Sequence, residues 1–512
     1  MYRNKLYLYG DDDLEVPVSM NLAHEMFKKI LSYKDNVAIL NAETKEQVTY
    51  SELAQRIANV AIALTRMGVG KGDVISICSE KSMQFLPTLL GIICTGATFA
   101  AADITCGSAT VLHRVNIVKP RFILCSELAY TRHGKQFGDK CIRLSEMEFK
   151  DVPLDQFQAV PVEGFKDNVI IFFSSGTTGL PKGIPTTHLS LLIGFLGAIK
   201  ANNYYLGRSV LCTREWYYSY GCMHTLICVF AGATIVYCPS DTEEEYIKAI
   251  QDLEISVLQL VPSTVARLVK SSLLEKYNVS SVKYVNSAST PLDADLMKVF
   301  KQKFTGIVDI YQFYGMSEVG FVTSDAHATK GTKLGSAGVA AASVIIKVVD
   351  MTSREPLGPH QRGEICMKSP TVTKGYLNVS SDGVFDEEGF LKTGDIGYYD
   401  EDGYFFIVER MKDLIKFNSY QVAPAELEAV LLQHPSVKDA AVVGVPHVEW
   451  GEVPTGLVVR QPGATTEAAE IVEFVNSQVS HRMCLAGGLK FVDALPYGGG
   501  GKLDRKVLKQ LL

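Results

Sequence analysis

The sequence lacks the features that define several specialised classes of protein. Its 11 cysteines are scattered, and it contains no CxxC pair and no group of His and Cys with zinc-binding spacing. Free thiols in a reducing compartment are therefore the expectation. Long runs of Lys or Arg are also missing, and 50 basic against 56 acidic residues give a formal charge of −6. That balance argues against nucleic acid as the main partner.

Neither a secretion signal nor a membrane span is indicated. The first 16 residues, MYRNKLYLYGDDDLEV, place acidic side chains where a signal peptide needs an apolar core. The most membrane-like stretch runs from Phe85 to Ala102 and is uncharged, but Pro87, Gly91 and Gly96 interrupt it. We therefore interpret it as a buried helix followed by a strand, and we expect no transmembrane segment.

The composition is that of a folded enzyme with two or more domains. A chain of 512 residues exceeds the size at which one core keeps growing, and 47% hydrophobic with 21% charged residues is typical of globular proteins. Up to about residue 400, apolar runs such as VISIC, FILC and VIIFF alternate with helix-like segments. This alternation predicts α/β layers around mostly parallel strands. Short strands and turns from Gly335 to Tyr404 predict a small β-rich section, and the C-terminal residues beyond it predict a small α+β domain.

A glycine-rich loop follows a buried strand in IIFFSSGTTGLPKG, residues 170–183. Its backbone N–H groups, four hydroxyls and the single cation of Lys182 could together surround an anion, most naturally a polyphosphate. The spacing is not that of a Walker A loop, because Leu180 and Pro181 separate the last glycine of the loop from the lysine. A plain solvent-exposed loop is the alternative, which the attached LPKG disfavours. The candidate phosphate-binding residues before Lys182 are Ser174, Ser175, Gly176, Thr177, Thr178 and Gly179.

This loop and four later motifs resemble the adenylate-forming superfamily of acyl-CoA synthetases, peptide-synthetase adenylation domains and beetle luciferases. The later motifs, in the order typical of that family, are YQFYGMSE (311–318), KTGDIGYYDEDGYFFIVERMKDLIK (392–416), YQVAPAELE (420–428) and PYGGGGKLDRK (496–506). The likeness covers nearly the whole chain and is strongest to insect luciferase-like and 4-coumarate:CoA ligase-like members. It implies a large N-terminal domain over residues 1–410, a mobile C-terminal domain over 411–512, and the use of ATP, Mg²⁺ and CoA.

The resemblance also implies roles for individual residues. Tyr314 would stack on adenine, Ser317 would bond the α-phosphate, and Glu318 would hold Mg²⁺, a cation that prefers oxygen ligands. Asp395 would accept hydrogen bonds from both ribose hydroxyls, with Arg410 close by. The remaining residues that the resemblance places near the nucleotide are Ser289, Thr290, Pro291, Gln312, Phe313, Gly315, Met316 and Ile407.

Catalysis would use lysines from both domains. Lys502, in GGGGKL, would reach the α-phosphate and the substrate carboxylate, while Lys182 would serve the phosphate loop. For the thioester step the C-terminal domain would rotate about a hinge at Lys412 and Asp413, after which Lys416 would line the thiol tunnel.

The chain departs from the family pattern on the nucleotide and thiol sides. The adenine-side loop, usually Gly-Ala-Pro, reads Ser289-Thr290-Pro291, which makes close backbone approach to the base less favourable and predicts a lower affinity for ATP. Ser419 replaces the usual glycine of the thiol tunnel, so that the thioester step is the less secure half-reaction.

The acid pocket departs as well. Tyr218 stands where the family has a histidine or an aromatic residue, and Phe313 stands where glycine is common. Together with Phe321 this ring should shorten or reshape the pocket, unless the two rings simply pack in the core. The expected pocket residues are Tyr218, Tyr220, Gly221, Phe313 and Phe321.

The expected activity is that of an ATP-dependent acid:CoA ligase acting on an apolar carboxylic acid, with a fatty acid first and an aryl-propenoic acid next. A luciferase-type monooxygenase and a catalytically weakened nucleotide-binding relative are the alternatives. The chain ends in KQLL, without the Ser-Lys-Leu type of peroxisomal signal that many luciferase-like relatives carry. We expect a cytoplasmic or peroxisomal protein, either a monomer or a weak homodimer.

Overall fold

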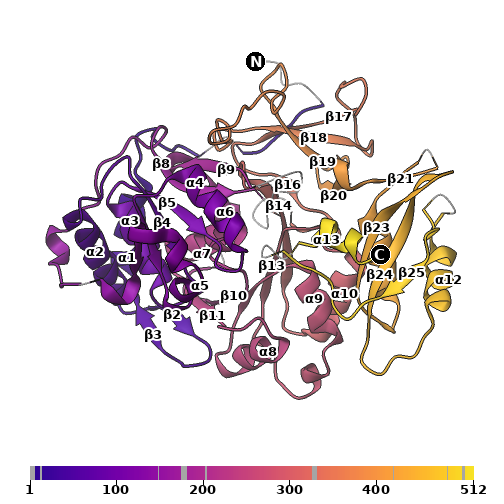
Figure 1. Ribbon diagram of the computed structural model, residues 1–512, viewed down its shortest axis with the longest axis horizontal. Helices are drawn as coiled ribbons and strands as arrows, with labels where there is room; N and C mark the ends of the chain where they lie inside the picture. Colours follow the sequence, from indigo (N-terminus) through magenta and orange to yellow (C-terminus); the bar gives the residue numbers. More distant parts are fainter. Residues whose placement is uncertain are drawn as a thin grey trace.

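The computed structural model describes residues 6–11, 14–147, 149–174, 181–201, 205–325, 331–418, 420–480, 483–498 and 502–512. The chain forms a large N-terminal domain with three sheets and a smaller C-terminal domain with a sheet of its own (Figure 1). The predicted class, layered α/β with a small β-rich section and a small α+β domain, is confirmed.

The largest sheet has nine strands and runs through the middle of the N-terminal domain. Its central strands are parallel and buried, so they read as nearly continuous apolar runs. In sheet order the strands are β16 (Val339–Ala340), β15 (Gly320–Ser324), β14 (Asp309–Met316), β13 (Tyr284–Ser287), β12 (Val257–Leu260), β10 (Ser209–Cys212), β11 (Thr234–Tyr237), β2 (Val37–Asn41) and β3 (Gln47–Thr49).

The second sheet has six strands and carries the predicted VISIC, FILC and VIIFF runs. Five of its strands are parallel neighbours, and the last, β9, returns antiparallel to β8. The order is β7 (Cys141–Arg143), β6 (Phe122–Cys125), β4 (Val74–Cys78), β5 (Thr98–Ala102), β8 (Asn168–Phe173) and β9 (Gly183–Thr187).

Helices connect and cover these sheets. The residue Thr49 starts α2 with a reciprocal capping pair to Glu52, and apolar residues at Leu53, Ile57 and Leu64 bury one face of that helix. The stretch from Phe85 to Ala102 is buried as α3 and β5, as predicted. The helices are α1 (Leu22–Tyr33), α2 (Tyr50–Arg66), α3 (Phe85–Cys94), α4 (Ser108–Val118), α5 (Glu127–Phe137), α6 (His188–Ala201), α7 (Ser219–Phe230), α8 (Glu243–Asp252), α9 (Pro262–Lys270) and α10 (Ala294–Lys303).

The β-rich section is an antiparallel five-stranded sheet. It consists of β17 (Ile345–Val349), β18 (Gly363–Lys368), β19 (Leu391–Tyr399) and β20 (Phe405–Arg410), with β1 (Leu8–Tyr9) at the edge beside β17. The sequence did not predict that the N-terminus supplies this edge strand. The register of β19 and β20 sets Asp395 directly opposite Arg410.

The C-terminal domain has its own apolar core, which includes Leu427, Leu431, Val442 and Val458. It also touches the large domain, because the Lys270 ammonium donates to the backbone oxygens of Leu432 at 3.2 Å and Val437 at 2.5 Å. Its elements are η5 (Met411–Asp413), β21 (Ile415–Phe417), β22 (Tyr420–Val422), α11 (Pro424–Gln433), β23 (Val437–His447), β24 (Gly451–Arg460), α12 (Ala468–Gln478), β25 (Leu489–Phe491) and α13 (Arg505–Gln510).

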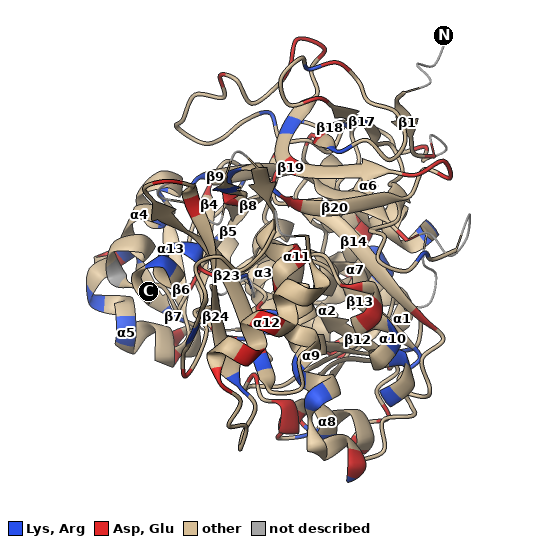
Figure 2. Ribbon diagram, turned by 90° about the vertical axis from the view of Figure 1, so that its right-hand side faces the viewer, with Lys and Arg blue, Asp and Glu red and all other residues tan. Residues whose placement is uncertain are grey.

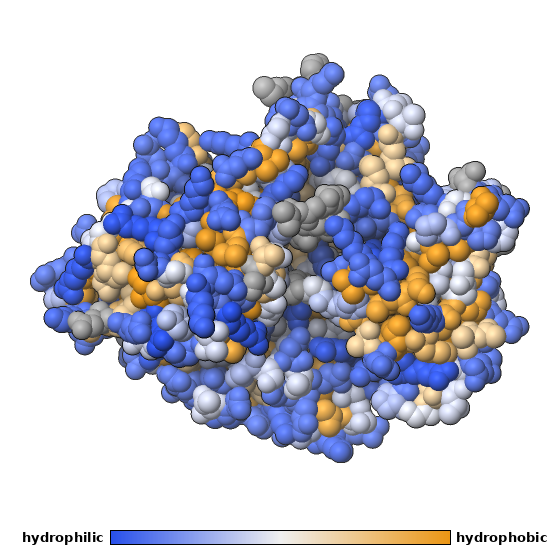
Figure 3. All heavy atoms as spheres, in the orientation of Figure 1, coloured by the Kyte–Doolittle hydropathy of each residue, from blue (hydrophilic) through white to orange (hydrophobic). Residues whose placement is uncertain are grey.

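The surface agrees with the modest charge of the sequence. Lys and Arg are dispersed among acidic side chains over the face drawn in Figure 2. No helix within the described ranges is long and apolar enough to span a bilayer. On the face drawn in Figure 3 the surface is hollowed between the two domains.

Candidate active site

The predicted phosphate loop connects β8 to β9. Residues 175–180, and with them Ser175, Gly176, Thr177, Thr178 and Gly179, lie outside the described part of the chain. The base of the loop is closed by two hydrogen bonds: the Ser174 N–H donates to the Lys182 carbonyl, and the Lys182 N–H donates to the Ser174 Oγ, both at 3.0 Å. This hairpin base fixes where the loop leaves the sheet and where the Lys182 side chain begins.

The strands β14, β19 and β20 bring Tyr314, Asp395 and Arg410 together. The buried Asp395 carboxylate accepts from the Tyr314 hydroxyl at 2.7 Å and pairs with the Arg410 Nε at 2.9 Å. Ile407 packs against the same apolar cluster as Tyr314, and so does Met316. The carboxylate expected on the ribose is thus oriented from two sides by protein groups.

Lys502 reaches this group from the C-terminal domain. Its loop is closed by the Gly498 N–H, which donates to the Lys502 carbonyl at 2.8 Å. Burial and the neighbouring Arg410 guanidinium lower the pKa of Lys502, and the nearby carboxylates of Asp395 and Glu318 oppose this. The two domains therefore meet with the candidate catalytic lysine facing the candidate nucleotide site.

Glu318 and Lys182 are linked by Tyr376, which the sequence analysis did not identify. The Tyr376 hydroxyl donates to a Glu318 carboxylate oxygen at 3.0 Å, and the Lys182 ammonium lies 4.7 Å from the centroid of the Tyr376 ring. No group of three or more His, Cys, Asp or Glu in the described residues is arranged to hold a metal ion. Glu318 alone is enough for a Mg²⁺ site, because proteins usually hold Mg²⁺ with one or two carboxylates together with substrate phosphates and water.

The adenine-side loop follows β13, and the Gln312 side chain holds its far end by hydrogen bonds to the backbone. The buried Gln312 amide accepts from the Leu292 N–H at 2.8 Å and donates to the Leu292 carbonyl at 3.2 Å. Gly315 cannot carry a side chain, because a Cβ there would meet the Gly320 carbonyl at 2.2 Å. Ser317 bonds Ser219, at the start of α7, with 2.8 Å between the two hydroxyl oxygens. Thr290 and Pro291 are exposed.

Ser289 carries backbone strain in that loop. Its φ is +85°, in the left-handed region that favours glycine. We expect Ser289→Gly to raise the free energy of unfolding by about 1 kcal/mol, since a side chain in this region costs roughly 1–2 kcal/mol and the flexibility of glycine returns part of that. Urea titration measures the change. Thr290→Gly, at a residue without positive φ, is the matched control and should destabilise; a less stable Ser289→Gly would contradict the interpretation.

Tyr218, at the position where the family has a histidine or an aromatic residue, makes a polar contact through its hydroxyl. Its hydroxyl donates a short hydrogen bond to the buried Asp103, which also accepts from Thr105 at 2.6 Å and lies 3.6 Å from Arg114. Burial acts to raise the pKa of Asp103, but the hydrogen bonds of Thr105, Tyr218 and Cys106 and the Arg114 charge lower it overall. The Tyr218 ring is therefore held by a buried anion that the sequence did not reveal.

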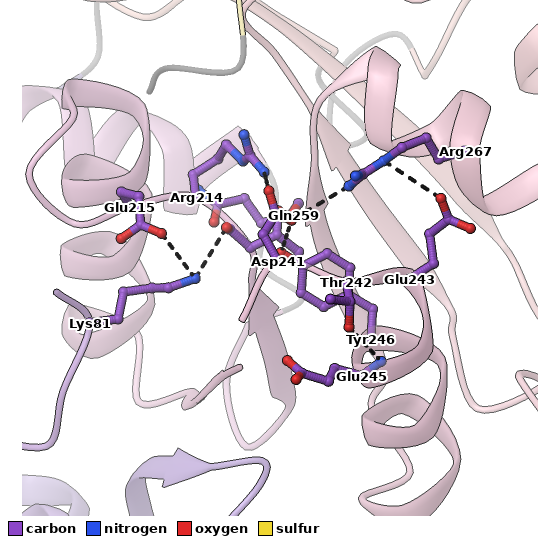
Figure 4. Close-up of polar contacts among 11 residues, drawn as sticks. Lys81, Arg214, Glu215, Asp241, Thr242, Glu243, Glu245, Tyr246, Gln259 and Arg267 are labelled. Atoms are coloured by element: carbon purple, nitrogen blue, oxygen red, sulfur yellow. Dashed lines mark hydrogen bonds and ion pairs between the residues drawn. The ribbon is translucent and has the colours of Figure 1, made fainter. Parts of the chain in front are cut away.

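A second polar cluster lies at the carboxyl ends of β10, β11 and β12, next to the start of α7 (Figure 4). The Asp241 carboxylate forms ion pairs with Arg214 at 3.3 Å and with Arg267 at 3.5 Å, and it accepts a hydrogen bond from the Tyr246 hydroxyl at 2.5 Å. Lys81 pairs with Glu215 at 3.6 Å in the same close-up. These contacts hold the segment that leads from β10 to the pocket tyrosines. The residues come from loops and from the helices α8 and α9, far apart in the sequence, so no local pattern could have predicted the cluster.

The remaining expected pocket residues lie in or against one large apolar cluster. The rings of Phe313 and Phe321 lie 5.5 Å apart, and both belong to the apolar cluster that Tyr218 and Tyr220 join. The Tyr220 hydroxyl donates to the Asn286 carbonyl at 3.3 Å. Position 221 requires glycine, because a Cβ there would lie 2.1 Å from the Glu215 carbonyl oxygen.

The hinge residues adjoin the Asp395–Arg410 group: burial and then the Arg410 charge lower the pKa of Lys412, and the Asp395 carboxylate opposes this. Lys412 and Asp413 form the short η5 turn directly after β20. Lys416 is exposed on β21, and its N–H donates to Glu452 at 3.0 Å. Ser419 lies outside the described residues.

Comparison with known proteins places the chain in a family. Residues 27–377 match the AMP-binding enzyme family, and residues 426–502 match the AMP-binding enzyme C-terminal domain. The luciferin 4-monooxygenase of Photuris pensylvanica is 32% identical over 99% of this chain and 98% of its own length. 4-Coumarate–CoA ligase 1 of Petroselinum crispum is 32% identical over 99% of this chain and 96% of its own.

Solved structures agree with this assignment. ATP-bound MatB from Rhodopseudomonas palustris superposes with a TM-score of 0.84 at 26% identity, covering 96% of this chain and 99% of that one. The luciferase-like enzyme from the nonluminescent mealworm Zophobas morio superposes with a TM-score of 0.73 at 27% identity, covering 80% and 100%. Fold and site thus define an adenylate-forming protein with two domains. The chain belongs to the AMP-binding enzyme family.

Proposed function

We propose that this protein activates an apolar carboxylic acid, most naturally a fatty acid, with ATP and transfers the acyl group to CoA. The observation that carries the proposal is the convergence of Lys502 and Arg410 on Asp395 and Glu318. Two cations from different domains at one pair of carboxylates suit a substrate with phosphate oxygens and a carboxylate, whose charge they would neutralise during the reaction.

The chemistry has two balanced steps. A carboxylate oxygen of the acid attacks the α-phosphorus of ATP, a new P–O bond forms, and the bond to the β-phosphate breaks to release pyrophosphate. The CoA sulfur then attacks the acyl carbon, a C–S bond forms, the C–O bond to AMP breaks, and the thiol proton passes to solvent. Lys502 stabilises the charge that develops in the first step, and Asp395 orients the ribose. Mg²⁺, bound through Glu318 and the phosphates, would reduce the negative charge of the nucleotide.

The test is release of pyrophosphate and AMP across fatty, aryl-propenoic and luciferin acids, with and without CoA. Turnover that rises with CoA and yields a thioester supports the proposal. Light emission with luciferin would support a luciferase-type oxidation, the activity named for the Photuris relative; the paired rings of Phe313 and Phe321 disfavour a large flat heterocycle. No pyrophosphate release with any acid would leave only a nucleotide-binding protein.

We place the domain boundary between Arg410 and Met411, and we infer that the C-terminal domain rotates there between the two steps. Glu409, on the N-terminal side of this boundary, is buried against groups from the other side. Its carboxylate accepts from the Ala425 N–H at 3.1 Å and lies 3.7 Å from Arg505, which also pairs with Glu428 at 2.9 Å. These contacts must break if the domain rotates.

The Glu409 contacts predict a pH dependence of the thioester step. Burial raises the pKa of Glu409 to about 7, with Arg505 opposing and Glu428 adding to the shift. Separation of the domains exposes the carboxylate and returns its pKa toward about 4.3. The closed arrangement therefore binds a proton that the rotated one does not. The stability that this proton gives the closed arrangement, relative to the rotated one, is fully present below about pH 4.3 and is lost as the pH rises through 7.

Between pH 6 and pH 8 the ratio of rotated to closed protein should rise about tenfold. Conversion of preformed acyl-AMP to acyl-CoA, in single turnovers, measures it. Glu409→Gln, which resembles the protonated form, should lose this part of the pH dependence. Ionisation of the CoA thiol affects both proteins equally, so the same pH ratio in both would contradict the role of Glu409.

A further inference from the structure

A cavity of about 460 Å³ is lined in part by the paired rings of Phe313 and Phe321. It is lined by residues of α6, β15, β16 and the N-terminal strand β1, and it is partly open to solvent. In Figure 1, α6 runs beside β14 and β16. The volume falls within the roughly 300–1,000 Å³ of sites that hold small molecules.

The helix α6 presents a bare backbone to this cavity at Gly194. The residue lies in the helix interior, where glycine stabilises a helix less than alanine does. A Cβ at Gly194 would meet no atom within 4 Å. Packing within the protein therefore does not require glycine there. At Gly197, one turn further on, a Cβ would make only ordinary contacts, at 3.4 Å to Ala342 and 3.6 Å to Leu14.

The lining of the cavity contains both apolar and acidic side chains. Its apolar residues include Ile193, Val319, Phe313 and Phe321. The carboxylates of the lining already have partners: Lys333 pairs with Asp400 at 2.5 Å and Asp402 at 3.3 Å, His360 lies 2.7 Å from Glu401, and Lys200 lies 3.9 Å from Asp11. An apolar chain suits the apolar part of the lining, whereas burial of a second carboxylate there would cost free energy, because the nearby cations are already paired.

We propose that this cavity is the distal part of the acid pocket and takes the terminal methylene groups of an unbranched aliphatic monocarboxylic acid. The inference rests on the proposed function, because it assumes that the acid binds on the Ser317 side of the two rings. Gly194 is then a specificity-determining residue: its missing side chain leaves room for the alkyl chain. The cost of burying a second carboxylate among the apolar lining residues disfavours α,ω-dicarboxylic acids.

The test compares butanoate, hexadecanoate and hexadecanedioate as substrates of the wild type, Gly194→Ala and Gly194→Leu. We expect Gly194→Leu to lower kcat/KM for hexadecanoate by at least about tenfold, the factor expected when two methylene groups lose their burial, and to leave butanoate within about twofold. Gly194→Ala should raise the melting temperature and affect hexadecanoate less. The wild type should prefer hexadecanoate to hexadecanedioate. Butanoate in the same variant is the control for fold and adenylation.

Equal losses for butanoate and hexadecanoate, or no loss for either, would overturn the inference while the proposed function stands. Equilibrium binding of a fluorescent alkyl acid, without ATP, separates the two failures. If no acid releases pyrophosphate, the proposed function fails. Binding that Gly194→Leu weakens would then still support the cavity as an alkyl site, and binding that is unaffected or absent would overturn it.

Discussion

Lys502→Ala should lower the rate of acyl-adenylate formation by roughly 10²- to 10³-fold, the effect of removing one preorganised charge-stabilising donor. Lys502 stands among Arg410, Asp395 and Glu318, the groups that would surround the α-phosphate. Its charge matters most when negative charge moves onto the leaving pyrophosphate and the attacking carboxylate is consumed. ATP binding in the ground state also uses the phosphate loop and Arg410, so ATP affinity should change by only a few fold.

Acid-dependent pyrophosphate release and calorimetric binding of a non-hydrolysable ATP analogue measure the two effects separately. Lys506→Ala is the matched control, because Lys506 is an exposed lysine four residues further along the same C-terminal segment. It should leave both quantities unchanged. Near-normal adenylation by Lys502→Ala would remove Lys502 from the mechanism, and a parallel loss of ATP affinity would make it a binding residue.

The fold was predictable wherever local pattern and tertiary packing agree. Buried parallel strands such as β4 and β8 read as short apolar runs because both of their faces are covered. The edge strand β1 was missed because its two residues have no pattern of their own. It is defined by pairing with β17, more than three hundred residues away.

The candidate site was predictable only as far as its motifs extend. Tyr314, Asp395 and Arg410 each lie in a recognisable stretch, and the structure joins them in one hydrogen-bonded group. Tyr376 and Asp103 were missed because neither belongs to those motifs. Each becomes significant only through a contact across the fold, with Glu318 or with Tyr218.

The departures from the family pattern divide in the same way. At Ser289 the sequence predicted a less favourable backbone approach to the base, and the structure adds the positive φ of this residue, a conformation that glycine, the usual residue there, adopts without strain. Whether Phe313 and Phe321 reshape the pocket could not be inferred from sequence. It depends on the space around the rings, and the structure shows that both rings and the bare backbone of Gly194 on α6 line one cavity.

Lys412→Pro should abolish most thioester formation while sparing adenylation. The structure holds the domains with Lys502 at the candidate nucleotide site, so adenylation needs no further rotation. The second step needs a backbone change in η5, directly after β20. Proline fixes φ near −65° and removes one N–H, so it should prevent that change. We expect acyl-CoA formation from preformed acyl-AMP to fall by about 10²-fold, corresponding to roughly 3 kcal/mol of added barrier.

Single-turnover assays of the two half-reactions on the same preparation measure this, with Lys412→Ala as the matched control. Alanine removes the ammonium but leaves φ free, so Lys412→Ala should retain the thioester step far better than Lys412→Pro. If alanine and proline impair it equally, the Lys412 charge and not the backbone is required. If Lys412→Pro loses both half-reactions to the same extent, the residue supports the closed arrangement itself, and the point of rotation must lie elsewhere between β20 and β21.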